Sequence, residues 1–218
     1  MKRKTETKTL YSCIDKTLIQ AMPQVKFDGK IIIVQSENEA KRAIDILSRE
    51  KIVGIDTETK PAFKKGVTNK VALLQVSTPD ICFLFRLNFI GLCEPIINFF
   101  GNGNVLKVGL SLHDDILALH RREDFESSGF LDLQNYVPTF GIKDKSLQKI
   151  YANVFGQRIS KAQRLSNWEA DTLSDKQKTY AATDAWACLM IYNELEKLHK
   201  THNYNLIEAN NEIQTADS

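Results

Sequence analysis

Short apolar runs, separated by polar turns and by stretches of helical periodicity, organise this chain. Most of these runs have the length of a strand and are rich in β-branched or aromatic residues, which predicts strands. The tripeptide Thr78-Pro79-Asp80 separates two of them and predicts an antiparallel hairpin. The predicted strands cover residues 31–34, 52–56, 71–77, 81–85 and 105–108, with a short one around Leu131 and Leu133.

Two capping boxes mark the clearest helices. Ser36 and Glu39 form the first, and apolar residues recur after it at a spacing of three and four. Ser174 and Gln177 form the second, which opens a long helix expected to end near residue 199. Early strands followed mostly by helices predict a mixed sheet with helices packed on it, in an α/β or α+β fold. Further helices are predicted at residues 15–21, 95–100 and 114–120, and from residue 146.

Composition narrows the class of protein. The 218 residues suit one domain, and 43% hydrophobic residues supply an ordinary core. The net charge of +2 is too small to indicate a nucleic-acid partner, so any basic surface must be local. The four cysteines form no CxxC pair, and no Cys/His spacing suggests zinc. Neither a secretory signal nor a run of transmembrane length occurs, so we expect a cytoplasmic protein without membrane contact.

Asp56 and Glu58 are the first candidate functional residues. They follow the apolar run of residues 52–55, and residues two apart in a strand share one face. Val53 and Ile55 would then face a core on the other side. Two ordinary acids at a solvent-facing strand end would give the same pattern, because this spacing is common.

Asp184 is a sharper signal, since it lies on the apolar face of the long helix. It shares a stripe with Cys188, Ile191, Leu195 and Leu198, at a repeat of three and four. Tyr180 lies one turn earlier on the same face. A buried carboxylate is costly unless it is paired with a cation or binds a metal. The stripe offers no obvious lysine or arginine, so we favour a metal ligand.

The adjacent acids Asp114 and Asp115 open the helix that follows the strand at 105–108. Acids in a first turn are also favoured by the helix dipole, which is sufficient to explain one of them. We expect one of the two to reach a site shared with the other acids. Converging acids of this kind indicate divalent-cation chemistry on phosphate esters.

Three segments together resemble the motifs of the DEDD superfamily of 3′–5′ exonucleases, in its tyrosine-bearing (DEDDy) branch. They are residues 53–58, residues 107–119 and residues 180–185. Residues 70–75 and 165–168 are also similar to the exonuclease domain of Werner syndrome-like proteins and, less closely, to ribonuclease D. Gly109 and Leu119 fix the register of the second motif on Asp115, while Asp114 stands where many members have an aromatic residue.

The resemblance implies a ribonuclease H-like fold, with a five-stranded mixed sheet whose first three strands are antiparallel. We expect residues 1–28 to be an N-terminal extension, residues 29–200 the exonuclease domain, and residues 201–218 a frayed polar tail. The chain would be a stand-alone catalytic domain, because it ends before a further C-terminal segment of the ribonuclease D or helicase type.

The resemblance also implies two Mg²⁺ or Mn²⁺ ions, about 3.5–4 Å apart as in two-metal sites generally. Asp56 would bridge them, Glu58 and Asp184 would hold the ion that activates the water, and Asp115 would support the second ion. Tyr180 would orient the attacking water rather than act as a full base, because a free tyrosine has a pKa near 10. The product would be a nucleoside 5′-monophosphate.

The expected partner is nucleic acid with a free 3′ end, and no nucleotide cofactor is expected. A basic, aromatic-bearing loop after the first motif could grip a strand, although a solvated lysine loop is an equal alternative. Trp168 could stack on a base or belong to the core. The candidate contacts are Thr59, Phe63, Lys64, Lys65, Lys70, Lys161, Arg164 and Trp168.

Two other functions remain open at this point. The chain could trim RNA 3′ ends like ribonuclease D, or be a catalytically silent module that binds nucleic acid. The closer likeness to the Werner-type domain favours DNA. The presence of four acids and the tyrosine favours an active enzyme over the silent module.

Overall fold

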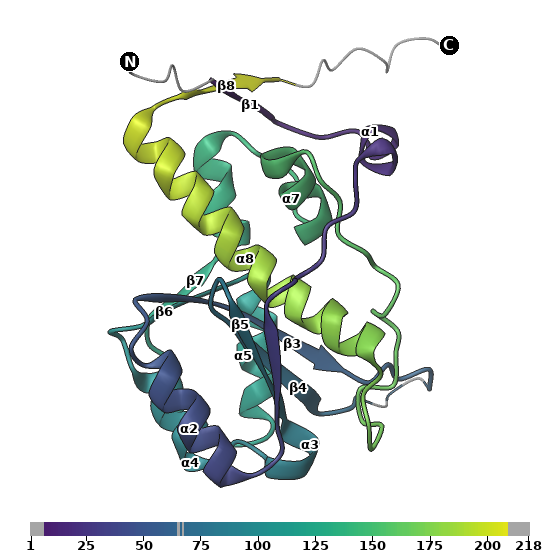
Figure 1. The fold of residues 1–218 in the computed structure, drawn as a ribbon, viewed down its shortest axis with the longest axis vertical. Coiled ribbons are helices and arrows are strands. Elements are labelled where there is room, and N and C mark those ends of the chain that lie inside the picture. The colour runs from purple at the N-terminus through teal and green to yellow at the C-terminus, as the bar shows by residue number, and fades with distance from the viewer. Residues whose placement is uncertain (1–6, 65, 67, 209–218) are drawn as a thin grey trace.

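A six-stranded mixed sheet forms the centre of the protein in the computed structural model, which describes residues 7–64, 66 and 68–208 (Figure 1). The strand order is β2-β5-β4-β3-β6-β7. The β3–β4 and β4–β5 pairs are antiparallel, while β2, β6 and β7 join their neighbours in parallel. These strands are β2 (Lys30–Val34), β3 (Ile52–Thr59), β4 (Val71–Ser77), β5 (Ile81–Arg86), β6 (Leu106–Gly109) and β7 (Phe130–Asp132).

The sheet agrees with the expected α/β fold and adds one strand to it. Strands β3, β4 and β5 are the expected antiparallel set, and the turn at Thr78 closes the hairpin through hydrogen bonds between Thr78 and Ile81. The expected number of five strands is wrong, because β2 pairs with β5 along its length and extends the sheet at that edge.

Helices cover both faces of the sheet. Apolar residues of α2, α4 and α5 pack against one face, and α8 lies across the other, with α7 beside it (Figure 1). The helices are α1 (Lys16–Ala21), α2 (Glu37–Leu47), α3 (Leu87–Ile90), α4 (Glu94–Gly101), α5 (Leu112–His120), α6 (Leu133–Tyr136), α7 (Leu147–Phe155) and α8 (Asp175–Thr201), with a 3-10 turn at Val137–Phe140.

Both predicted capping boxes are present, at the starts of α2 and α8. The predicted stripe of α8 is buried along its whole length, from Asp184 to Leu198. Within the part of the chain that the structure describes, no helix combines the length and the apolar character needed to cross a membrane. Helix α8 therefore owes its apolar stripe to packing on the sheet and on α7.

The two ends of the described chain pair with each other, which differs from the expected extension and frayed tail. Strand β1 (Lys8–Tyr11) runs parallel to β8 (Tyr204–Ile207), beyond the end of α8 (Figure 1). Leu10 is fully buried in the core formed by α7 and α8. Apolar burial at Leu10 therefore anchors β1, and the segment expected to fray contains a paired strand.

Candidate active site

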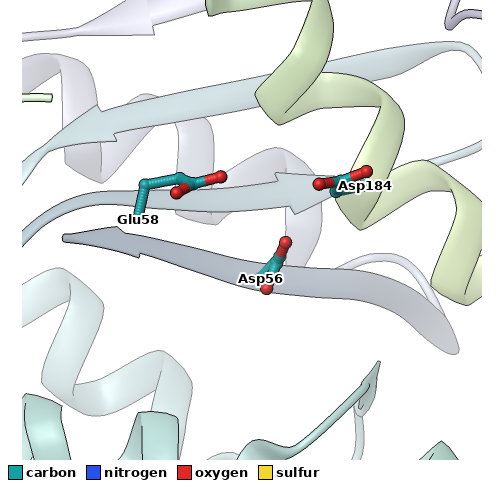
Figure 2. Close-up of side chains that lie close together, drawn as sticks. All are labelled: Asp56, Glu58 and Asp184. Atoms are coloured by element: carbon teal, nitrogen blue, oxygen red, sulfur yellow. The ribbon is translucent and has the colours of Figure 1, made fainter. Parts of the chain in front are cut away.

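Three carboxylates meet between β3 and α8. Oxygen atoms of Asp56, Glu58 and Asp184 all lie within 4.8 Å of one another. Figure 2 shows the Asp56 and Glu58 side chains rising from the sheet toward Asp184, which descends from α8. Glu58 is 8% exposed and Asp184 is 4% exposed, so neither is a solvated acid at a strand end. The structure thus brings together three of the acids singled out in the sequence.

The absence of a side chain at position 54 lets α8 approach β3 closely enough to form this cluster. A Cβ built on Gly54 would lie 1.9 Å from the carbonyl oxygen of Ala185, the residue after Asp184. That distance is far inside van der Waals contact, and the atom is backbone. Glycine is therefore required where the helix crosses the strand, two residues before Asp56.

Burial and mutual repulsion make the cluster hard to ionise. Burial, followed by the charges of Asp184 and Asp115, raises the pKa of Glu58 to about 9. Burial raises the pKa of Asp184 to about 7. Burial, and next the charge of Asp115, holds the pKa of Asp56 well above its usual range. A nearby cation would lower these pKa values, so the raised values mean that no positive charge of the protein compensates the three acids.

The site has the properties expected of a divalent-cation site. Among the residues that the structure describes, Asp184 has no ion-pair partner, and its Oδ1 is buried without a hydrogen-bond donor. The potential ligands are carboxylate oxygens, which are the ligands preferred by Mg²⁺ and Mn²⁺. A bound cation would remove the repulsion and satisfy the orphaned oxygen.

We expect the metal-free protein to lose stability as the pH rises. The raised pKa values of Asp184 and Glu58 mean that the folded chain binds more protons than the unfolded chain between about pH 4 and about pH 9, so the free energy of unfolding falls across that window. In EDTA the melting temperature should drop by at least about 5 °C between about pH 5 and about pH 9. Saturating Mn²⁺ should cancel the drop, whereas equal slopes with and without Mn²⁺ would contradict a cation site at these acids.

Asp115 lies beside the cluster rather than inside it. Pairing between β3 and β6 ends at Gly54 and Val108, and α5, which follows β6, carries Asp115 toward the half of β3 that β6 does not pair with. There Thr57 donates a hydrogen bond of 2.7 Å to Asp115 Oδ1. Burial raises the pKa of Asp115 to about 6, and this hydrogen bond opposes the rise.

The other acid of the adjacent pair, Asp114, is exposed at the start of α5. The charge of Asp115 raises the pKa of both Asp56 and Glu58, and that of Asp114 contributes to neither. Of the two adjacent acids, Asp115 is therefore the one within electrostatic reach of the cluster.

Tyr180 adjoins Asp184 one turn along α8, as helical spacing requires. Its hydroxyl is near enough to the Asp184 carboxylate for each group to shift the pKa of the other. Burial, then the charges of Asp184 and Glu58, raises the pKa of Tyr180. The phenol therefore stays protonated at neutral pH and can act as a hydrogen-bond donor.

Trp168 belongs to the core, which is one of the two alternatives for this residue and excludes base stacking. Its side chain is fully buried and packs against the ring of Tyr180, with centroids 6.1 Å apart. A buried ring offers no open face to a nucleotide. Trp168 instead supports the position of Tyr180, which is the alternative that the sequence left open.

Most of the remaining candidate contacts lie on exposed loops, after β3 and before α8. Phe63 is 88% exposed, and Lys64, Lys70, Lys161 and Arg164 are also exposed. Lys65 lies outside the described residues, and Thr59 is half-buried at the end of β3. Lys60 pairs with Glu169 at 3.1 Å and so ties the loop after β3 to the turn that carries Trp168.

Sequence reasoning overlooked three residues of the site. Thr57 donates a hydrogen bond to Asp115, and Gly54 leaves room for the close approach of α8. Both residues lie in the first motif, on opposite faces of the strand by alternation. Gln75 lies directly across from Asp56 on β4, fully buried, with neither carboxamide atom hydrogen-bonded within the described structure. The sequence feature that could have indicated Gln75 is a glutamine within the apolar run of residues 71–76.

Comparisons with known proteins agree with this geometry. A family model described as 3′–5′ exonuclease matches residues 31–200. The mouse bifunctional 3′–5′ exonuclease/ATP-dependent helicase WRN is 29% identical over 202 residues, which cover 87% of this chain and 14% of that protein. A 3′–5′ exonuclease of Arabidopsis thaliana is 28% identical over 192 residues, covering 81% of this chain and 67% of that protein.

Solved structures support the fold. The crystal structure of the Aedes aegypti Nibbler EXO domain superposes with a TM-score of 0.71 at 24% identity, covering 80% of this chain and 91% of that domain. The match of the family model includes β3, α5 and α8, which carry the acids. The chain therefore belongs to the 3′–5′ exonuclease family.

Proposed function

We propose that this protein is a metal-dependent 3′–5′ exonuclease that releases nucleoside 5′-monophosphates and favours DNA over RNA. One observation carries the proposal: Asp56, Glu58 and Asp184 form a largely buried cluster of carboxylates within 4.8 Å, beside a protonated tyrosine. A cluster of this kind has no structural use that would offset its cost. It is suited to binding cations that stabilise charge on a phosphodiester.

The four acids divide the work of holding two divalent cations. Asp56 would contribute to both positions, Glu58 and Asp184 to the first, and Asp115 to the second. When bound, the ions supply Lewis acidity at the scissile phosphate and lower the pKa of the attacking water. The raised pKa values of the acids mean that cation binding releases protons, so cation affinity increases with pH.

Tyr180 positions the attacking water. Its hydroxyl lies beside Asp184 and keeps its proton, so it serves as a fixed dipole and not as a base. The buried Trp168 ring packs against the ring of Tyr180 and helps to hold it in place. Such preorganisation lowers the barrier because no group must reorient during reaction.

Thr57 is expected to set the pH at which the second cation position becomes competent. Thr57→Val removes the 2.7 Å hydrogen bond that lowers the pKa of Asp115, so that pKa rises from about 6. The acid limb of the rate profile should move to higher pH, and Mn²⁺ affinity should fall by about 10–100-fold. Thr57→Ser keeps the hydroxyl and is the matched control. Equal behaviour of the two variants in calorimetry and pH–rate profiles would exclude a role for the hydrogen bond.

Exposed basic and aromatic side chains around the site support a polynucleotide substrate. Phe63 and Lys64 project from the loop after β3, and Lys161 and Arg164 from the loop before α8. Phosphate contacts and base stacking by such residues hold single strands without reading their sequence. DNA is the favoured polymer because the likeness to the Werner-type exonuclease extends over 87% of the chain.

Matched DNA and RNA oligonucleotides labelled at the 5′ end test this function. With Mg²⁺ or Mn²⁺, the wild type should produce a ladder shortened from the 3′ end, faster on DNA than on RNA. Faster trimming of RNA would reassign the substrate to a ribonuclease D-like role. Binding of either polymer without any divalent-dependent trimming would identify a silent binding module and overturn the proposal.

A further inference from the structure

A pocket of about 490 Å³ lies on the flank of α8 next to Tyr180. One wall is the N-terminal segment of residues 24–26, the second is the loop of residues 160–163, and the floor is the first half of α8. Its volume is in the range of sites that hold one small molecule or nucleotide. The family model begins at residue 31, so the first wall lies outside the matched region.

The N-terminal wall is held firmly against the loop and the helix. Val25 donates its backbone N–H to the carbonyl of Arg158, and Arg158 in turn donates its own to Pro23, which makes a short parallel bridge. The backbone N–H of Phe27 donates a 3.0 Å hydrogen bond to the Thr183 hydroxyl on α8. These bonds fix the segment on both sides of Lys26, so the pocket is a preformed feature of the fold.

The pocket carries a local positive charge. Lys26 lines it from the N-terminal wall and Lys176 from the floor; both are exposed, and neither has an ion-pair partner among the residues of known position. Asp175 also lines the pocket, but Lys178 neutralises it at 2.6 Å. Gln24 and Ser160 add neutral polar groups. Two lysine side chains without ion-pair partners, with amide and hydroxyl groups nearby, suit a phosphate-bearing ligand.

We propose that this pocket binds the polynucleotide strand on the 5′ side of the scissile bond, holding one nucleotide and its phosphates. The inference rests on the proposed function, which defines the scissile bond at the acid cluster. Tyr180 lines the pocket and lies one helical turn before Asp184 on α8, so the pocket adjoins the reacting phosphate. Its exposed walls let a strand continue outward, which a terminal nucleotide would not need. The N-terminal segment is thus part of the substrate path.

Binding without turnover tests the proposal. Anisotropy of a 5′-fluorescein oligothymidylate of about 12 nucleotides, measured in EDTA, gives the affinity of the full chain without hydrolysis. The double variant Lys26→Gln/Lys176→Gln should weaken binding about tenfold and reduce the slope of log K against log salt by about 1.4, the effect of two lost phosphate contacts on a single strand. Ala162→Trp, which fills the pocket without a change of charge, should weaken binding as well.

The control is Lys41→Gln/Lys51→Gln, which removes two exposed lysines outside the pocket. It should change the affinity for the oligonucleotide by less than about twofold. The slope of log K against log salt should stay close to that of the wild type. Equal losses in the control and the pocket variants would overturn the proposal. The proposal would also be overturned if the pocket variants lost affinity for free nucleoside 5′-monophosphate but bound the oligonucleotide as the wild type does. Absence of hydrolysis by the wild type would refute the proposed function separately, because the binding assay needs no turnover.

Discussion

Replacement of Asp56 by asparagine is expected to slow 3′-terminal hydrolysis by at least about 10³-fold, or roughly 4 kcal/mol of transition-state stabilisation. Asp56 is one of the three clustered carboxylates and the one assigned to both cations. Asparagine has nearly the same shape and offers one neutral oxygen, so cation binding is lost with little change in packing. Single-turnover rates on a labelled oligonucleotide measure the effect.

The same substitution should stabilise the metal-free protein at high pH. The amide that replaces the carboxylate carries no charge, whereas Asp56 is repelled by Asp115, Asp184 and Glu58. The melting temperature of Asp56→Asn in EDTA should therefore exceed that of the wild type above about pH 8, and Mn²⁺ should no longer raise it. A variant that is inactive because it is misfolded would melt at a lower temperature instead.

Gly54→Ala is expected to be the most disruptive small substitution in the protein. The new Cβ would fall 1.9 Å from the Ala185 carbonyl oxygen, so α8 must move away from β3. Overpacking of this kind costs about 1–3 kcal/mol or more of folding stability. Because Asp184 precedes Ala185, the cluster opens as well, and a displacement of about 1 Å lowers the rate about 10²-fold. Thermal unfolding and initial rates of hydrolysis measure the two effects.

Gly101→Ala is the matched control for this prediction. Its Cβ would have the Glu126 carbonyl oxygen at 3.7 Å as its nearest neighbour, which is ordinary contact. Alanine should be tolerated there without loss of activity. Wild-type stability and activity in Gly54→Ala would show that α8 does not depend on close approach to β3 for the placement of Asp184.

Local sequence patterns predicted the parts of the fold that depend on neighbouring residues. The hairpin of β4 and β5, the capping boxes at Ser36 and Ser174, and the buried stripe of α8 all depend on spacing within one segment. The pairing of β1 with β8 joins segments from opposite ends of the described chain. The pattern of residues within each segment does not indicate which strand it pairs with, so the sequence alone could not predict this pairing.

The acid cluster was accessible from sequence, but its supporting contacts were not. Asp184 was recognisable because a charge on an apolar helix face conflicts with its surroundings. The contact of Thr57 with Asp115 depends on where α5 meets the end of β3, and the burial of Trp168 depends on α8 covering it. Both are consequences of tertiary packing. The 24–26 wall beside Tyr180 is a third example, since hydrogen bonds to distant backbone and to α8 hold it there.

Release of the 3′-terminal nucleotide tests the central claim most directly. A strand labelled in its last nucleotide is incubated with the full chain and Mg²⁺ or Mn²⁺. We predict that the label appears first as a free nucleoside 5′-monophosphate, that Asp56→Asn releases almost none, and that excess EDTA stops the reaction. Label that first appears in shorter oligonucleotides, or release that continues undiminished in EDTA, would contradict a metal-dependent 3′–5′ exonuclease centre at Asp56, Glu58 and Asp184.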